Sequence, residues 1–125
     1  MSNIPEELKY TKKHEWARIE GNRVTVGLSD HAQEELTDIV YVELPKVGQG
    51  IQAGSELATV ESVKSTSDVY SPVTGKVVEV NSDLENSPDI INSDPYGKGW
   101  LAVIECADMK SAELITADEY RALLG

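Results

Sequence analysis

Short runs in which apolar residues alternate with polar ones dominate the chain and predict β-strands. Such runs occupy residues 16–19 and 23–27, on either side of the segment Glu-Gly-Asn. Gly21 and Asn22 supply the backbone conformations that a tight turn requires. The pattern therefore predicts a β-hairpin over this part of the chain.

A further strand is predicted in the segment DIVYVELP, residues 38–45. Val40, Val42 and Leu44 occupy every second position, so their side chains should share one buried face of a sheet. Pro45 lacks the backbone N–H that would continue a ladder, and it should end the strand.

One short helix is predicted in the segment SDHAQEELTD, residues 29–38. Asp30 is expected at the N-cap with Gln33 three residues later, which is the spacing of a capping box. The segment should form about two helical turns.

The second half of the chain predicts two more helical pieces and another strand. Ser87 as N-cap and Pro88 as the first helical residue should begin a brief helical turn. The segment WLAVIEC, residues 100–106, reads as a strand, and Thr116 with Glu119 forms a second capping-box pattern before a C-terminal helix. Many short strands with few helices predict a mainly β fold, an antiparallel sandwich or flattened barrel.

Composition limits the size of the molecule and the kind of partner it can bind. A chain of 125 residues with 40% hydrophobic content fits a single domain over residues 1–125. Asp and Glu outnumber Lys and Arg by 22 to 11, giving a net charge of −11. Nucleic acids and anionic membranes bind through clusters of basic residues, so neither is an expected partner.

Cysteine usage and the N-terminus point to the cytoplasm. Cys106 is the single cysteine of the sequence, so no internal disulfide can form, and a small core residue is its expected role. The start of the chain lacks the basic and apolar regions of a secretory signal, and no apolar run approaches a membrane-spanning length. We expect a cytoplasmic protein.

The sequence offers few residues for catalysis or metal binding. His14 and His31 are the two histidines, and neither lies in a recognisable catalytic motif. The spacing of these histidines and the cysteine matches no zinc site, and the carboxylates do not form an EF-hand loop. We therefore expect no catalytic residues, no metal and no enzyme activity of the chain itself.

Lys64 lies among valines, serines and threonines, and local turn rules alone do not distinguish it. However, the segment ESVKSTSDVYSPVTGKVVEV, residues 61–80, resembles the lipoyl-attachment hairpin of the lipoyl/biotinyl carrier superfamily. In that hairpin a lysine at the turn precedes a Pro-x-x-Gly segment, here Pro72 to Gly75. Biotin-accepting lysines lie in sequences such as Ala-Met-Lys-Met, whereas Lys64 lies between a valine and a serine, which disfavours biotin.

Residues 13–48 and 91–105 extend the resemblance, which is to the glycine cleavage system H proteins and runs from about residue 8 to residue 124. It implies a flattened antiparallel β-sandwich, the barrel-sandwich hybrid of lipoyl domains, with short peripheral helices and a C-terminal helix. It also implies lipoate in amide linkage to Lys64. The dithiolane of the lipoyl group would supply sulfur chemistry that the side chains lack.

The function implied by this resemblance is that of a carrier with a swinging arm in glycine catabolism and one-carbon metabolism. The carrier would take the aminomethyl group of glycine from a pyridoxal-phosphate glycine decarboxylase to a tetrahydrofolate-dependent aminomethyltransferase. Dihydrolipoamide dehydrogenase would then reoxidise the dithiol, and lipoylating enzymes would install the arm. An alternative is a lipoyl relay that donates lipoate to other carrier domains, since both functions need Lys64.

Three carboxylates are candidates for recognition of the lysine or docking of the arm. Glu61, three residues before Lys64, resembles an acidic residue of H proteins and could help a lipoylating enzyme to orient its acceptor. Glu15 and Asp68 could bind the cationic amine of a loaded arm and protect it from water. An exposed contact of this kind would contribute about 1 kcal/mol.

Overall fold

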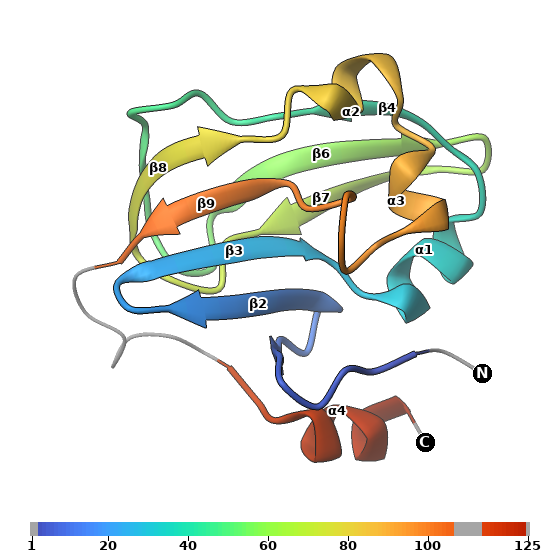
Figure 1. Ribbon diagram of the computed structural model, residues 1–125. Coiled ribbons are helices and arrows are strands. Elements are labelled where there is room, and N and C mark those ends of the chain that lie inside the picture. The colour runs from blue at the N-terminus through green and yellow to red at the C-terminus, as the bar shows by residue number, and fades with distance from the viewer. Residues whose placement is uncertain (1–2, 107–113, 125) are drawn as a thin grey trace.

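The computed structural model describes residues 3–106 and 114–124 (Figure 1). The strands are β1 (Lys9–Tyr10), β2 (Glu15–Glu20), β3 (Arg23–Leu28), β4 (Ile39–Glu43), β5 (Gly50–Ile51), β6 (Glu56–Ser62), β7 (Thr66–Tyr70), β8 (Gly75–Val80) and β9 (Ala102–Glu105). The helices are α1 (Asp30–Leu36), α2 (Asp83–Asn86), α3 (Ile90–Ser93) and α4 (Ala117–Leu124).

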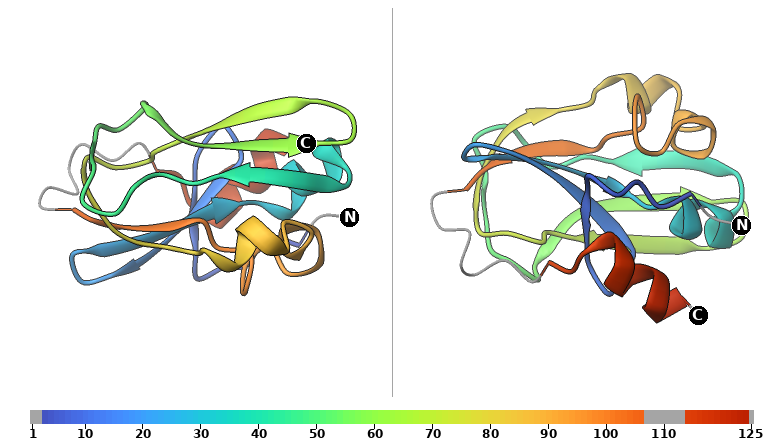
Figure 2. Two further views of the ribbon diagram at one scale, coloured as in Figure 1. Left: turned by 90° about the horizontal axis from the view of Figure 1, so that it is seen from above. Right: turned by 60° about the horizontal axis from the view of Figure 1, so that its bottom comes forward.

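The strands form two antiparallel sheets that pack face to face (Figure 2). The larger sheet has the order β1-β2-β3-β9-β8-β5, and the smaller one has the order β4-β6-β7. This arrangement confirms the predicted flattened β-sandwich with short helices and a C-terminal helix. Among the described residues, no helix is long and apolar enough to cross a membrane.

The predicted N-terminal hairpin is confirmed. Strands β2 and β3 pair in register from Glu15–Leu28 to Glu20–Arg23, and Gly21 adopts a φ of 65° in the turn. On β3, a Cβ atom at Gly27 would lie 2.6 Å from the ring of Trp16, so glycine allows the indole to cover the strand.

Strand β4 differs from its prediction because it contains an irregularity. Its register against β6 shifts between Ile39 and Tyr41, as in a β-bulge. The expected alternation is therefore broken: Ile39 and Val42 are buried, whereas Val40 is 52% exposed. The prediction that Val40 faces the core was wrong, because strict alternation assumes a ladder without an extra residue.

Helices α1 and α3 begin at other residues than predicted. Ser29, not Asp30, is the N-cap of α1, and its Oγ accepts a hydrogen bond from the Ala32 amide at 3.2 Å. Asp30 instead accepts a hydrogen bond from the Gln33 side chain within the first turn, at 2.7 Å. Helix α3 follows the N-cap Asp89, two residues beyond the predicted Ser87.

The C-terminal capping box is confirmed. The Glu119 amide donates to Thr116 Oγ1 at 3.2 Å, and the Thr116 amide donates to Glu119 Oε1 at 3.0 Å. Two amides that have no partner inside helix α4 are satisfied in this way.

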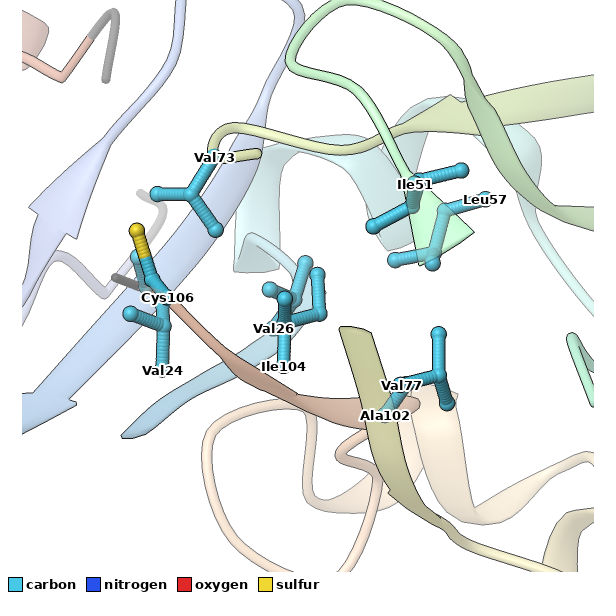
Figure 3. Packing of buried hydrophobic residues seen from close by; sticks show 10 residues of the cluster. Val24, Val26, Ile51, Leu57, Val73, Val77, Ala102, Ile104 and Cys106 are labelled. Carbon is cyan, nitrogen blue, oxygen red and sulfur yellow. The ribbon is translucent and has the colours of Figure 1, made fainter. Parts of the chain in front are cut away.

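The core consists of three clusters. One lies between the sheets and contains Cys106 among mainly β-branched side chains, which confirms the structural role expected of this cysteine (Figure 3). The second joins the inner face of the small sheet to α1, α2 and α3 through the buried side chains of Ala32, Leu84 and Ile91. The third packs Tyr120 of α4 against Tyr10 and Trp16. The helices therefore complete the core, a larger contribution than the sequence pattern suggested.

The segment Pro72–Gly75 carries the chain from β7 in the small sheet to β8 in the large one. Ser71 holds the start of this crossing, because its Oγ donates to the Val73 carbonyl at 2.6 Å. A Cβ atom at Gly75 would lie 2.1 Å from the carbonyl oxygen of Glu105, so only glycine allows this close approach to β9.

Candidate functional site

Lys64 lies at the exposed turn between β6 and β7, at one end of the sandwich. The last paired residues are Glu61 and Thr66, and the turn is closed by a hydrogen bond of 2.8 Å from the Ser62 amide to the Ser65 carbonyl. The β6–β7 connection projects beyond the sheets beside α1 (Figure 1). The lysine is thus presented to solvent by two rigid, paired strands.

The side chain of Ser62 stabilises this turn. Its Oγ accepts hydrogen bonds from the amides of Lys64, at 3.2 Å, and Ser65, at 3.0 Å. A serine hydroxyl can close a turn in this way without glycine or asparagine. Sequence reasoning missed this residue, and the available signal was a serine two positions before the lysine.

The turn also rests on the end of helix α1 and the segment that follows it. The Val63 amide donates to the Asp38 carbonyl at 3.0 Å, and Lys64 Nζ donates to the Glu35 carbonyl at 3.2 Å. Carbonyls in the last turn of a helix have no partner inside the helix and carry partial negative charge, so a cationic amine stabilises them.

Asn92 of helix α3 fixes the segment between α1 and β4. Its Nδ2 donates to the Thr37 carbonyl at 2.8 Å and to Gln33 Oε1 at 3.0 Å, and its Oδ1 accepts from the Ile39 amide at 2.9 Å. Thr37 has a φ of 64°, which is unusual for a β-branched residue. The hydrogen bonds of Asn92 hold this conformation of Thr37, the residue before Asp38, whose carbonyl binds the turn that bears Lys64.

Glu61 and Asp68 both lie on the outer face of the small sheet. Glu61 is exposed on β6, opposite Tyr41 of β4 and Thr66 of β7. Asp68 is exposed on β7, where its Oδ1 accepts a hydrogen bond of 3.4 Å from Thr59. Asp68 is four residues from Lys64, a separation of about 13 Å along a strand.

Glu15 lies in a different environment, since its side chain is only 2% exposed. Its Oε1 accepts a hydrogen bond of 2.6 Å from Thr11, and its Oε2 accepts one of 3.1 Å from the Tyr70 amide. Burial raises the pKa of the Glu15 carboxyl, although these hydrogen bonds oppose the shift. Glu15 therefore lies at the base of the hairpin, beside Tyr70 of β7, which is two residues beyond Asp68. It lies away from the turn that bears Lys64.

A cavity of about 550 Å³ lies beside Glu15 at the base of the hairpin. Its wall combines Thr11, Lys13, Gly54 and Tyr70, and Lys13 Nζ lies 3.9 Å from the centre of the Tyr70 ring. These residues come from the β1–β2 connection, the turn before β6 and the end of β7, so no sequence spacing predicts that they meet. Sequence reasoning named Glu15 as a candidate residue and missed its neighbours in this wall.

The histidines take part in packing. His14 Nδ1 lies 2.8 Å from the hydroxyl of Tyr120, and the rings of His14 and His31 lie 4.7 Å apart. Burial lowers the pKa of His14, and the neighbouring His31 adds to this effect. Within residues 3–106 and 114–124, no group of three or more His, Cys, Asp or Glu side chains is arranged to hold a metal ion.

Comparison with known proteins places this geometry in a family. Residues 8–125 match the family model described as glycine cleavage H-protein. A glycine cleavage system H protein of Coprothermobacter proteolyticus is 60% identical, and the match covers 98% of each chain. One from Xanthomonas campestris pv. campestris strain B100 is also 60% identical, over 99% of this chain and 96% of the relative. The crystal structure of a glycine cleavage system H protein from Mycobacterium marinum superposes with a TM-score of 0.91 at 41% identity, covering 98% of this chain and 99% of that one.

Proposed function

Because this chain belongs to the glycine cleavage H-protein family, we propose that Lys64 is the residue that carries its lipoyl group. H proteins are carriers and not catalysts, and they bear lipoate covalently on a lysine. They work with glycine decarboxylase, aminomethyltransferase and dihydrolipoamide dehydrogenase, the P-, T- and L-proteins of the glycine cleavage system. The names of the relatives favour this role over the lipoyl relay.

The observation that supports Lys64 is its place at an exposed turn whose backbone is fixed on both sides. Its side chain is exposed, and its amine donates a hydrogen bond to the Glu35 carbonyl at the surface, so an acyl donor can approach it. When bound, the lipoyl group supplies the dithiol chemistry of the cycle. The chain contributes a rigid attachment point, because Ser62 closes the turn and the Val63 amide binds Asp38.

Lipoylation in vitro tests this assignment directly. The purified chain is incubated with lipoate, ATP and a lipoate ligase, and its peptides are mapped by mass spectrometry. We expect the modification on Lys64, and we expect the Lys64→Arg variant to remain unmodified and inactive as a carrier. Lys76→Arg is the matched control and should be modified normally. Modification at Lys46 or Lys76, or an active Lys64→Arg carrier, would refute the assignment.

We propose that Glu61 helps the lipoylating enzyme to orient Lys64. Its carboxylate is exposed on the strand that leads into the turn, at the last pair of the β6–β7 ladder. The Glu61→Ala variant should therefore be lipoylated more slowly, by about fivefold, which corresponds to the loss of one exposed charge contact. If the Glu61→Ala variant folds normally and is lipoylated at the wild-type rate, Glu61 does not orient Lys64 for the enzyme.

We propose that Asp68 and Glu15 bind the cationic amine of the loaded arm. Lysine with an attached lipoyl group spans about 15 Å when extended, estimated from single-bond lengths. An arm of this length that folds back along β7 would reach Asp68, at about 13 Å, and its end, lengthened by the aminomethyl group, would point toward the cavity beside Glu15, which begins near Tyr70 at about 20 Å along the strand. Asp68 would bind the amine of the arm in solvent, whereas Glu15 would bind it in a largely desolvated environment.

We further propose that the protein acts in the cytoplasm. The single cysteine, Cys106, is a free thiol buried in the core. The reducing conditions of the cytoplasm keep such thiols reduced.

A further inference from the structure

Three apolar side chains are exposed around the turn that bears Lys64. Val40 is 52% exposed, Tyr41 is 49% exposed and Val63 is 68% exposed. We call these three residues the tip patch. Single exposed apolar residues are ordinary on protein surfaces, but these gather at one end of one small sheet, beside the proposed modification site.

The local backbone explains why the tip patch faces outward. The register shift between Ile39 and Tyr41 turns two consecutive side chains, Val40 and Tyr41, away from the core. Tyr41 pairs with Glu61, three residues before Lys64, and the Val63 amide binds the carbonyl of Asp38, directly before β4. Tyr41 and Val63 are therefore held on paired or hydrogen-bonded backbone, and Val40 lies at the register shift between the paired residues Ile39 and Tyr41.

The surroundings of the tip patch are acidic. Asp38 and Glu61 are both exposed beside it, and the whole chain has a net charge of −11. An apolar centre with a charged rim is the usual anatomy of a protein interface. The complementary surface would have an apolar socket surrounded by lysine or arginine side chains.

We propose that the tip patch is the docking surface for the enzyme that forms the amide on Lys64, and that this enzyme presents a basic rim and an apolar socket. The inference depends on the proposed function, since it requires Lys64 to be the acceptor. An unmodified lysine reaches only about 6 Å from its Cα atom. An enzyme that acts on the amine itself must therefore contact the residues next to the turn, whereas the enzymes of the cycle are reached through an arm of about 15 Å.

The reaction requires an activated lipoyl group, the mixed anhydride of lipoate and AMP, which forms when the lipoate carboxylate attacks the α-phosphorus of ATP and pyrophosphate leaves. The deprotonated Nζ of Lys64 attacks the acyl carbon, the bond from this carbon to the phosphate oxygen breaks, and AMP leaves. One proton passes from the amine to a base or to water. The hydrogen bond from Nζ to the Glu35 carbonyl must break before the amine can enter the enzyme.

The test measures lipoylation kinetics with a purified lipoate ligase, lipoate and ATP for Tyr41→Ser, Val63→Ser and the double variant. We expect kcat/KM to fall about tenfold for Tyr41→Ser, since aromatic anchors dominate interfaces, and further in the double variant. Val47→Ser is the matched control: Val47 is 62% exposed and belongs to the segment between β4 and β5. This segment lies at the end of the sandwich opposite to the β6–β7 connection (Figure 2). We expect the rate of the Val47→Ser variant to be unchanged. For wild type, higher ionic strength should raise KM.

Further measurements separate this proposal from its alternatives. Once lipoylated to completion, the Tyr41→Ser variant should be reduced at the wild-type rate by dihydrolipoamide dehydrogenase working in reverse, with NADH as the electron donor. Equal losses with both enzymes, unchanged lipoylation in the double variant, or a dimer that Tyr41→Ser dissociates would each overturn the proposal. If wild type itself is modified elsewhere than at Lys64, the proposed function fails; if it is modified at Lys64 and the patch variants react normally, only this inference fails.

Discussion

At the scale of single residues, three carboxylates near one hairpin differ in their environment. Glu61 and Asp68 are exposed, whereas Glu15 is buried and accepts two hydrogen bonds. A contact between an amine and an exposed carboxylate contributes little, because water screens it. The same contact with a desolvated, hydrogen-bonded carboxylate is stronger. The two proposed arm-binding residues should therefore contribute unequally.

Decay of the loaded, isolated carrier tests this inequality. We expect Glu15→Gln to lose its aminomethyl group about tenfold faster than wild type, and Asp68→Asn about fivefold faster. The decay is followed by release of formaldehyde and ammonia, after normal lipoylation and folding have been confirmed. Glu79→Gln, an exposed carboxylate on β8 in the other sheet, is the control. Unchanged decay in both variants, and in the two combined, would show that these residues do not protect the arm.

At the scale of elements, the turn that bears Lys64 depends on residues far away in the sequence. Helix α3 supplies Asn92, which fixes the connection between α1 and β4, and this connection supplies the Asp38 carbonyl for the turn. The hairpin is thus supported directly by α1, through the Glu35 carbonyl, and indirectly by α3, through the connection that Asn92 fixes.

The Asn92→Ala variant should loosen the turn without removing it. Loss of the side chain leaves the Ile39 amide without its acceptor, and we expect the free energy of unfolding to fall by about 1–3 kcal/mol. Hydrogen exchange should accelerate at the Val63 amide, which binds the same connection. Asn86→Ala, at an exposed position of α2, should change neither quantity. Equal exchange at Val63 in Asn92→Ala and wild type would contradict this support.

The sequence predicted those elements whose signals are local. Gly21 with Asn22, and Thr116 with Glu119, act within a few residues of one another, and both predictions were confirmed. The orientation of Val40 was predicted wrongly, because a bulge depends on the partner strand. Lys64 was predicted as the lipoyl site by resemblance alone, since a turn closed by a serine hydroxyl has no strong local signal.

At the scale of the whole molecule, a histidine joins parts of the chain that are far apart in sequence. His14 precedes β2, contacts the ring of His31 in α1, and bonds with the hydroxyl of Tyr120 in α4. The same hydroxyl lies 2.7 Å from Ser29 Oγ. His14 has a φ of 72°, a conformation that asparagine also tolerates. The C-terminal helix is therefore linked to both the large sheet and α1 through one titratable side chain.

This link should make stability depend on pH. Burial, followed by the charge of His31, lowers the pKa of His14, so the unfolded chain binds a proton at a higher pH than the folded one. The contribution of neutral His14 to the free energy of unfolding is thus complete above about pH 6.5, and it is lost as the pH falls through the folded-state pKa of His14. Thermal unfolding of wild type and His14→Asn at pH 7.5 and 5.5 measures it. The advantage of wild type should shrink at pH 5.5, and an equal advantage at both values would exclude this linkage.

The fixed turn around Lys64 also sets a limit on diffusion. Because the Val63 amide and the Ser62 hydroxyl hold the backbone, the lipoyl group that we propose on Lys64 would move only with the lysine side chain, and its reactive sulfurs would stay within about 15 Å of one point. Once the carrier has docked on an enzyme, the effective concentration of these sulfurs at the active site depends on that small volume and not on the concentration of carrier in the cell. A looser turn would enlarge the volume and dilute the sulfurs, even if every contact with the enzyme were kept.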